Sequence, residues 1–162
     1  MNWLKLSLIV AVSSFAMAAF SQAQPDAATK EAIKATALDY IDGWYTGDAE
    51  RMERALSPDL AKRIVLTDSR SHHSVLRQMS AMTLVQGVKH GGGKDTPAEK
   101  RQEDVTILDV FQDAASVKIV ADTWVDYLHM AKFDGRWVIV NVLWALKSPP
   151  APPVASPKPS GS

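Results

Sequence analysis

Two pairs of polar side chains in the C-terminal half of the chain have the types and spacing that acid–base catalysis requires. Asp126 and Asn141 stand among apolar residues, and apolar surroundings raise the pKa of a carboxylic acid, which suits a general base. Tyr127 and His129 lie two residues apart, so a strand would present both on one face. The alternatives are an aspartate that reaches solvent or pairs with a lysine, and a Tyr–His pair that packs in an interface. Asp126 and His129 are therefore the candidate catalytic residues.

The histidine spacing does not predict a metal site. His72 and His73 are adjacent, which rarely directs both rings to one metal, and none of the four histidines are four residues apart. We expect His73 to line the mouth of a pocket, and we predict no metal and no cofactor. The stretch Gly91–Lys94 does not fit a phosphate-binding loop, because Asp95 follows where Ser or Thr is needed. It predicts a flexible linker instead.

Aromatic side chains suggest a binding site. Tyr40 and Trp44 are four residues apart in a stretch with helical spacing, so both belong to one apolar face. Core packing is the alternative role for each of them. The predicted ligand-binding residues are Tyr40, Trp44, His73, Trp124, Asp126 and Asn141.

A hairpin turn at Asp134–Gly135 positions the polar pairs. Asp-Gly between two alternating apolar runs favours a two-residue turn in which both residues have positive φ. Continuous pairing from this turn places Asp126 with Asn141 on one face, and Tyr127 with His129 on the other. The sequence leaves open which face is concave. Both faces are apolar enough to be covered, one by helices and the other by a second subunit.

The remaining pattern predicts helices followed by antiparallel strands. The expected helices are Ala27–Thr46, a short segment capped by Asp48, and Ser74–His90. The expected strands are Leu60–Thr67, Asp104–Phe111, Ala115–Phe133 and Arg136–Leu146. This order predicts an α+β fold with helices packed on one face of a curved sheet.

The two ends of the chain differ from the part between them. Residues 1–23 combine Lys5, an apolar run, and small residues at Ser21 and Ala23, which predicts a signal peptide cut after Ala23 and a periplasmic or secreted protein. A membrane anchor is the alternative, which the short run disfavours. We expect residues 24–147 to form one domain and the proline-rich residues 148–162 to be a disordered tail.

Composition excludes several classes of protein. The 18 Lys and Arg residues balance 18 Asp and Glu residues, so we expect no nucleic-acid partner and no membrane association after signal cleavage. The chain has no cysteine, which excludes disulfides, cysteine-based zinc sites and a thiol nucleophile.

Two segments resemble a known family. YIDGWYTGD (residues 40–48) and DYLHMAKFDGRWVIVNVLW (residues 126–144) are similar to the putative lumazine-binding family of the NTF2-like, ketosteroid-isomerase-like superfamily, and the likeness extends over Ala27–Lys147. The resemblance implies a cone: a curved antiparallel sheet wrapped around three N-terminal helices, with a pocket at the open end and dimers through the sheet. The superfamily includes both enzymes and ligand carriers, so the resemblance does not choose an activity.

The prediction for function is non-catalytic binding of a small apolar or aromatic ligand in the cone. One alternative is an isomerase or dehydratase that uses a pocket aspartate or histidine as general base. Another is a protein-interaction or accessory module that uses the sheet face and the proline-rich tail. A homodimer through the sheet is the expected assembly.

Overall fold

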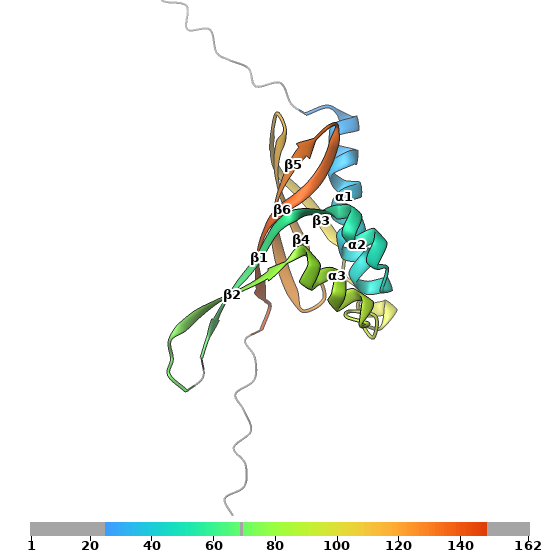
Figure 1. Ribbon diagram of the computed structural model, residues 1–162. Helices are drawn as coiled ribbons and strands as arrows, with labels where there is room; N and C mark the ends of the chain where they lie inside the picture. The colour runs from blue at the N-terminus through green and yellow to red at the C-terminus, as the bar shows by residue number, and fades with distance from the viewer. Residues whose placement is uncertain (1–24, 69, 149–162) are drawn as a thin grey trace, which may run out of the picture.

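The computed structural model describes residues 25–68 and 70–148 (Figure 1). The predicted signal peptide, residues 1–23, and all but the first residue of the predicted tail, residues 148–162, lie outside the described residues. Three helices lie on one side of a curved six-stranded sheet, which confirms the predicted α+β cone (Figure 1). In the described part of the chain, no helix is long and apolar enough to cross a membrane.

The first helix begins and ends where the sequence predicts, and the second begins where it predicts. Helix α1 spans Ala27–Thr46 and is capped by Asp26, whose carboxylate accepts a hydrogen bond from the Thr29 amide at 2.7 Å. Gly47 ends it with a left-handed φ of 73°. Asp48 then caps helix α2, Ala49–Ala55.

The segment that follows α2 differs from the prediction. Strand β1 spans Leu56–Thr67 and pairs with β2, Ser74–Ser80, in a hairpin that projects from the body of the molecule (Figure 1). Helix α3 is therefore only Ala81–Lys89, and the predicted helix over Ser74–His90 is wrong in its first half. The apolar spacing of that half resembles a helix, but antiparallel pairing with β1 determines its conformation.

The last four strands form a meander. A single 3-10 turn, Ala98–Lys100, precedes strand β3, Asp104–Phe111. The predicted long strand over Ala115–Phe133 is instead two antiparallel strands, β4 (Ala114–Val120) and β5 (Trp124–Phe133). Strand β6 is Arg136–Leu146, as predicted.

The sheet is mixed and not wholly antiparallel. Its strand order is β2-β1-β6-β5-β4-β3, and β1 runs parallel to β6 while every other neighbouring pair is antiparallel. This correction affects the candidate site, because the parallel pair brings β1 beside the C-terminal half of β6 and so adds a face of β1 to the interior.

The Asp134–Gly135 turn has the predicted form, but the register beyond it does not continue unbroken. Both residues have positive φ, 48° and 81°, as a type I′ turn requires. Met130 pairs with Ile139, yet His129 pairs with Asn141, so Val140 is an extra residue in a β-bulge. Because a shift of one residue exchanges the two faces of a strand, the prediction that Asp126 and Asn141 share a face is wrong.

The bulge determines which side chains face the helices. Asp126, Leu128 and Met130 are buried on the inner face of β5, whereas Tyr127 and His129 are exposed on its outer face. On β6, Val142 and Trp144 join the inner face, whose concave side holds the helices and the core.

Candidate functional site

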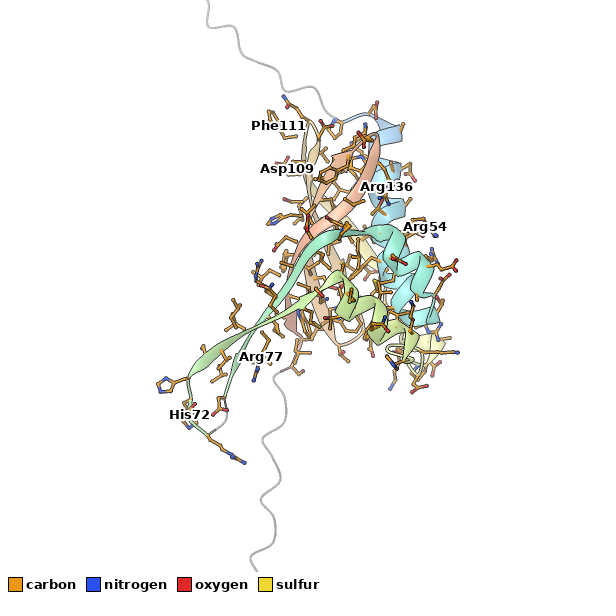
Figure 2. The ribbon with its side chains drawn as sticks, in the orientation of Figure 1. Arg54, His72, Arg77, Asp109, Phe111 and Arg136 are labelled. Carbon is orange, nitrogen blue, oxygen red and sulfur yellow. The ribbon has the colours of Figure 1, made fainter. Side chains whose placement is uncertain are left out.

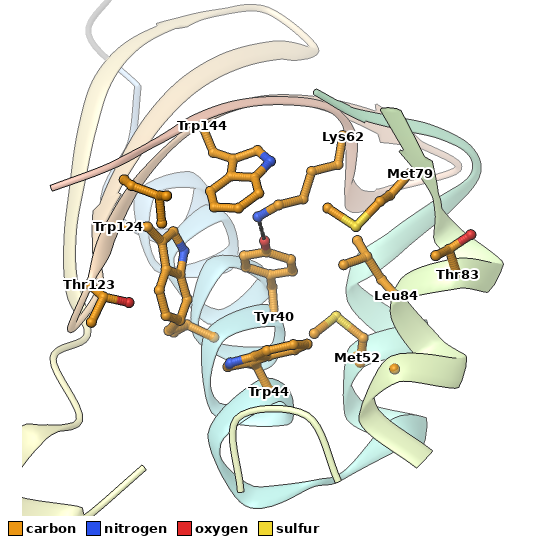
Figure 3. Close-up of a pocket in the computed structure, with 13 residues that line it drawn as sticks. Tyr40, Trp44, Met52, Lys62, Met79, Thr83, Leu84, Thr123, Trp124 and Trp144 are labelled. Atoms are coloured by element: carbon orange, nitrogen blue, oxygen red, sulfur yellow. Dashed lines mark hydrogen bonds between the residues drawn. The ribbon is translucent and has the colours of Figure 1, made fainter. Parts of the chain in front are cut away.

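A cavity of about 430 Å³ lies between the helices and the inner face of the sheet (Figure 3). Its size is within the range of small-molecule sites, about 300–1,000 Å³. It is lined by Tyr40, Ile41, Trp44, Met52, Lys62, Met79, Thr83, Leu84, Gly87, Thr123, Trp124, Trp144 and Leu146. Of the predicted ligand-binding residues, Tyr40, Trp44 and Trp124 therefore line one pocket.

A turn rich in glycine holds Trp44 in the cavity wall. A Cβ added to Gly92 would lie 2.8 Å from the Trp44 ring, so only glycine allows this close approach. The amides of Gly91 and Gly92 donate to the last turn of α3 at 2.9 Å each. The predicted flexible linker is thus a packed turn. Trp44 in turn meets the ring of Trp124 edge to face, with centroids 6.3 Å apart.

A buried ion pair forms the floor of the cavity. Lys62 Nζ lies 2.6 Å from Asp126 Oδ1 and donates a second hydrogen bond to the Tyr40 hydroxyl, also at 2.6 Å. Asp126 Oδ2 accepts from the Tyr40 hydroxyl at 3.1 Å and from Trp124 Nε1 at 2.8 Å. Asp126 is 0% exposed and does not line the cavity, while Lys62 does. The carboxylate therefore accepts three hydrogen bonds behind the side chains that a ligand would contact.

The surroundings raise the pKa of Tyr40 and lower the pKa of Lys62. Burial raises the pKa of the Tyr40 phenol well above its usual value, and the charge and hydrogen bond of Asp126 raise it further. Burial lowers the pKa of Lys62, and Asp126 opposes this shift. The Lys62 ammonium also lies 4.9 Å from the centre of the Trp144 ring, at cation–π distance. We call Tyr40, Lys62, Trp124, Asp126 and Trp144 the inner cluster.

The other predicted polar pair lies on the opposite side of the sheet. His129 Nδ1 and Asn141 Nδ2 are 3.2 Å apart, and Asn141 Oδ1 accepts from Arg63 Nη1 at 2.9 Å. Arg63 Nε also donates to Gln78 Oε1 at 2.8 Å. We call Arg63, Gln78, His129 and Asn141 the outer cluster. None of its members lines the cavity, so the structure separates Asn141 from the ligand-binding residues with which it was predicted to act.

His73 is also far from the cavity in the fold. It lies in the loop that joins β1 to β2 and is exposed, next to His72 at the tip of the projecting hairpin (Figure 2). Among residues 25–68 and 70–148, no group of three or more acidic or histidine side chains could hold a metal ion.

The prediction from sequence missed two members of the inner cluster, Lys62 and Trp144. The alternation Leu60, Lys62, Ile64 places Lys62 on the buried face of β1, and this period of two was visible in the sequence. Continuous pairing from the Asp134–Gly135 turn places Trp144 on the face of Tyr127 and His129, which is wrong because of the bulge at Val140, and this bulge leaves no clear signal in the sequence.

Solved structures show the same architecture. A protein from Methylobacillus flagellatus KT has a TM-score of 0.59 at 18% identity, over 77% of this chain and 97% of that one. Proteins from Shewanella baltica OS155 and Silicibacter pomeroyi DSS-3 each have a TM-score of 0.56 at 16% identity, over 77% and 76% of this chain and 99% and 100% of theirs. All three are described as NTF2-like or NTF-2 like proteins of unknown function. No curated protein is similar enough to match the sequence.

Helices held in the concave side of a curved sheet, with a pocket between them, define an NTF2-like fold. Within this class, a family model described as "Putative lumazine-binding" matches residues 28–145. The chain belongs to that family.

Proposed function

We propose that this protein binds a small, mainly apolar and aromatic ligand in the cavity and releases it unchanged. The observation that carries the proposal is the cavity wall: three tryptophans, Tyr40 and two methionines enclose a space of small-molecule size. Indole and phenol rings favour flat partners, and methionine side chains adapt to irregular ones. The family description is consistent with a small-molecule ligand.

The position of the candidate acid–base groups favours binding over catalysis. A general base must come within hydrogen-bond distance of the proton that it removes. Asp126 is 0% exposed and its oxygens already accept from Lys62, Tyr40 and Trp124. His129 is on the outer face, away from the cavity. Among the described residues, none that lines this pocket is an aspartate or histidine that could serve the isomerase or dehydratase alternative.

A variant that fills the cavity tests the proposal. Gly87 lines the cavity from α3, and a Cβ there would lie 3.8 Å from Trp44, an ordinary contact. Gly87→Leu should extend into the cavity and weaken binding of the neutral fluorescent probe N-phenyl-1-naphthylamine at least about tenfold. Gly87→Ala is the matched control. It should bind the probe like the parent and gain about 1 kcal/mol of stability, because alanine is the better helix former.

Fluorescence titration with the probe distinguishes the outcomes. Loss of binding in Gly87→Leu alone supports the proposal. If the parent does not bind the probe, or if both variants bind it equally well, the cavity is not the site. Displacement of the probe by lumazine would extend the ligand class to pteridines.

The outer face of the sheet is the proposed surface for a homodimer. Tyr127 and Leu143 are cross-strand neighbours, 47% and 52% exposed, and Val65 and Leu76 continue the apolar strip onto the hairpin. Sedimentation equilibrium should give twice the mass of one chain for the parent and a single-chain mass for Leu143→Glu. A monomeric parent would refute the dimer.

Export is proposed from the sequence of residues 1–23. Expression of the full chain in a Gram-negative host should yield a periplasmic product whose first residue is Gln24, as intact-mass spectrometry would show. Retention of the full-length chain in the cytoplasm would refute export.

A further inference from the structure

The hydrogen-bonding capacity of the cavity is one-sided. No described residue that lines it carries a carboxylate or an amide side chain, and its side-chain oxygens are only the hydroxyls of Tyr40, Thr83 and Thr123. The Tyr40 hydroxyl already accepts from Lys62 and donates to Asp126. The Thr83 hydroxyl already shares a hydrogen bond with Ser80 at 3.1 Å. Among the described residues, the Thr123 hydroxyl is the one of the three with no side-chain hydrogen bond. A ligand that depends on donating hydrogen bonds would therefore find few partners in this cavity.

Donors, in contrast, remain available. An ammonium group has three N–H donors, and Lys62 uses two of them, on Asp126 and Tyr40. The third is the only N–H of this cation without an assigned acceptor among the described residues. Trp144 Nε1 also has no hydrogen-bond partner within the described part of the chain, but this atom is buried, so Lys62 is the donor that a ligand would reach. Both residues line the cavity. Buried donors without acceptors are costly, so an acceptor from the ligand would be stabilised there.

The charge of the floor determines which acceptor fits. Lys62 is already paired with Asp126 at 2.6 Å, so the floor has no net charge. An acceptor on the third N–H would lie about 4–5 Å from the Asp126 oxygen, given the tetrahedral ammonium. A ligand anion at that point would repel the carboxylate in apolar surroundings, where such repulsion is strong. A neutral oxygen gains the hydrogen bond without the repulsion.

Resting on the proposed function, we propose that the ligand is a neutral, flat aromatic compound whose carbonyl-type oxygen accepts from Lys62 at the floor of the cavity. Its rings contact Trp44, Trp124 and Trp144. The proposed ligand class is therefore aromatic ketones and similar carbonyl compounds with two or three rings, a size that suits a cavity of about 430 Å³.

Three probes of nearly the same shape test the inference by displacement of N-phenyl-1-naphthylamine. They are 2-acetylnaphthalene, a neutral ketone; 2-isopropenylnaphthalene, in which CH2 replaces the carbonyl oxygen; and 2-naphthoate, an anion. We expect the ketone to bind the parent at least about tenfold more tightly than the other two, as a hydrogen bond from a charged donor provides. Lys62→Met/Asp126→Asn should remove the preference and still bind the hydrocarbon, which shows that the cavity persists. Gln78→Ala, on the outer face, is the control that should keep the preference.

Each outcome has one meaning. Equal binding of ketone and hydrocarbon by the parent overturns the inference and leaves the proposed function standing. Tightest binding of naphthoate overturns it in favour of an anion site. A ketone preference that persists in Lys62→Met/Asp126→Asn overturns the assignment to Lys62. Binding of none of the probes refutes the proposed function as well.

Discussion

The inner and outer clusters use alternate residues of the same strand, yet their environments differ in kind. Asp126 and His129 are three residues apart on β5. The network of Asp126 reaches across β6 to Lys62 of β1, and that of His129 joins β5 to its neighbour β6. The inner network contains a charged pair enclosed by tryptophan rings, whereas the side chains of the outer network are exposed or half-buried in the single chain. Removing the partner of a buried polar group lowers the stability of the fold strongly, whereas an exposed group exchanges its lost partner for water. The same types of interaction should therefore have large effects inside the cone and small ones outside it.

The largest expected effect is the loss of one member of the buried ion pair. Asp126→Ala leaves the Lys62 ammonium buried without its counter-charge, which costs about 3–5 kcal/mol in comparable buried pairs. Urea denaturation followed by circular dichroism measures the change. Lys62→Met/Asp126→Asn removes both charges and should be less destabilised than Asp126→Ala. A loss below about 1 kcal/mol in Asp126→Ala would show that the pair is not buried as described.

A smaller effect is expected at alkaline pH, from Tyr40. Its folded-state pKa is raised above the unfolded value near 10, so its contribution to stability is complete below that pH and is lost as the pH rises. The lowered pKa of Lys62 has the opposite sign, and its destabilising effect ends near its unfolded pKa of about 10.4. Above pH 10.5, Tyr40 should therefore contribute a fall of up to about 1.4 kcal/mol per pH unit.

Tyr40→Phe isolates this contribution. The variant should be less stable than the parent at pH 8 by about 1–3 kcal/mol, because the hydrogen bonds of the Tyr40 hydroxyl to Asp126 and from Lys62 are both lost. It should lose less stability than the parent between pH 10.5 and pH 12. Parallel curves for parent and variant would contradict the pKa assigned to Tyr40.

The smallest effects are expected on the outer face. In the Leu143→Glu background, where no second subunit covers the outer face, His129→Ala removes one exposed hydrogen bond and should change the free energy of unfolding by no more than about 0.5 kcal/mol. Asn141→Ala also removes the half-buried hydrogen bond from Arg63 and should cost no more than about 1 kcal/mol. Neither should change binding of N-phenyl-1-naphthylamine, because neither residue lines the cavity. A change of several fold in probe affinity for either variant would remove the distinction between the two faces.

The features that the sequence predicts correctly are those determined by residues close together in the chain. The bounds of α1 follow from its apolar face and from Gly47, and the β5–β6 turn follows from Asp134–Gly135. Tyr40 and Trp44 are predicted on one wall because helical spacing alone places them there.

The remaining features depend on contacts between distant segments. The turn after β4 has no glycine or proline to mark it. The Asp122 amide donates instead to the Tyr45 hydroxyl of α1 at 3.0 Å. The sequence of strand β2 has the apolar spacing of a helix, and its strand conformation depends on pairing with β1. The bulge at Val140 reverses the face of every later residue in β6 relative to continuous pairing. The inner cluster could thus be predicted only in part, since Lys62 reaches Asp126 through the parallel pairing of β1 with β6.

The most direct test of the central claim, that the floor of the inner cavity recognises a ligand through Lys62, is a crystal structure of the protein with 2-acetylnaphthalene. We predict the naphthalene rings between Trp44 and Trp144, and the ketone oxygen about 3 Å from Lys62 Nζ. A ligand bound on the outer face of the sheet, or one in the cavity with its oxygen directed away from Lys62, would contradict it.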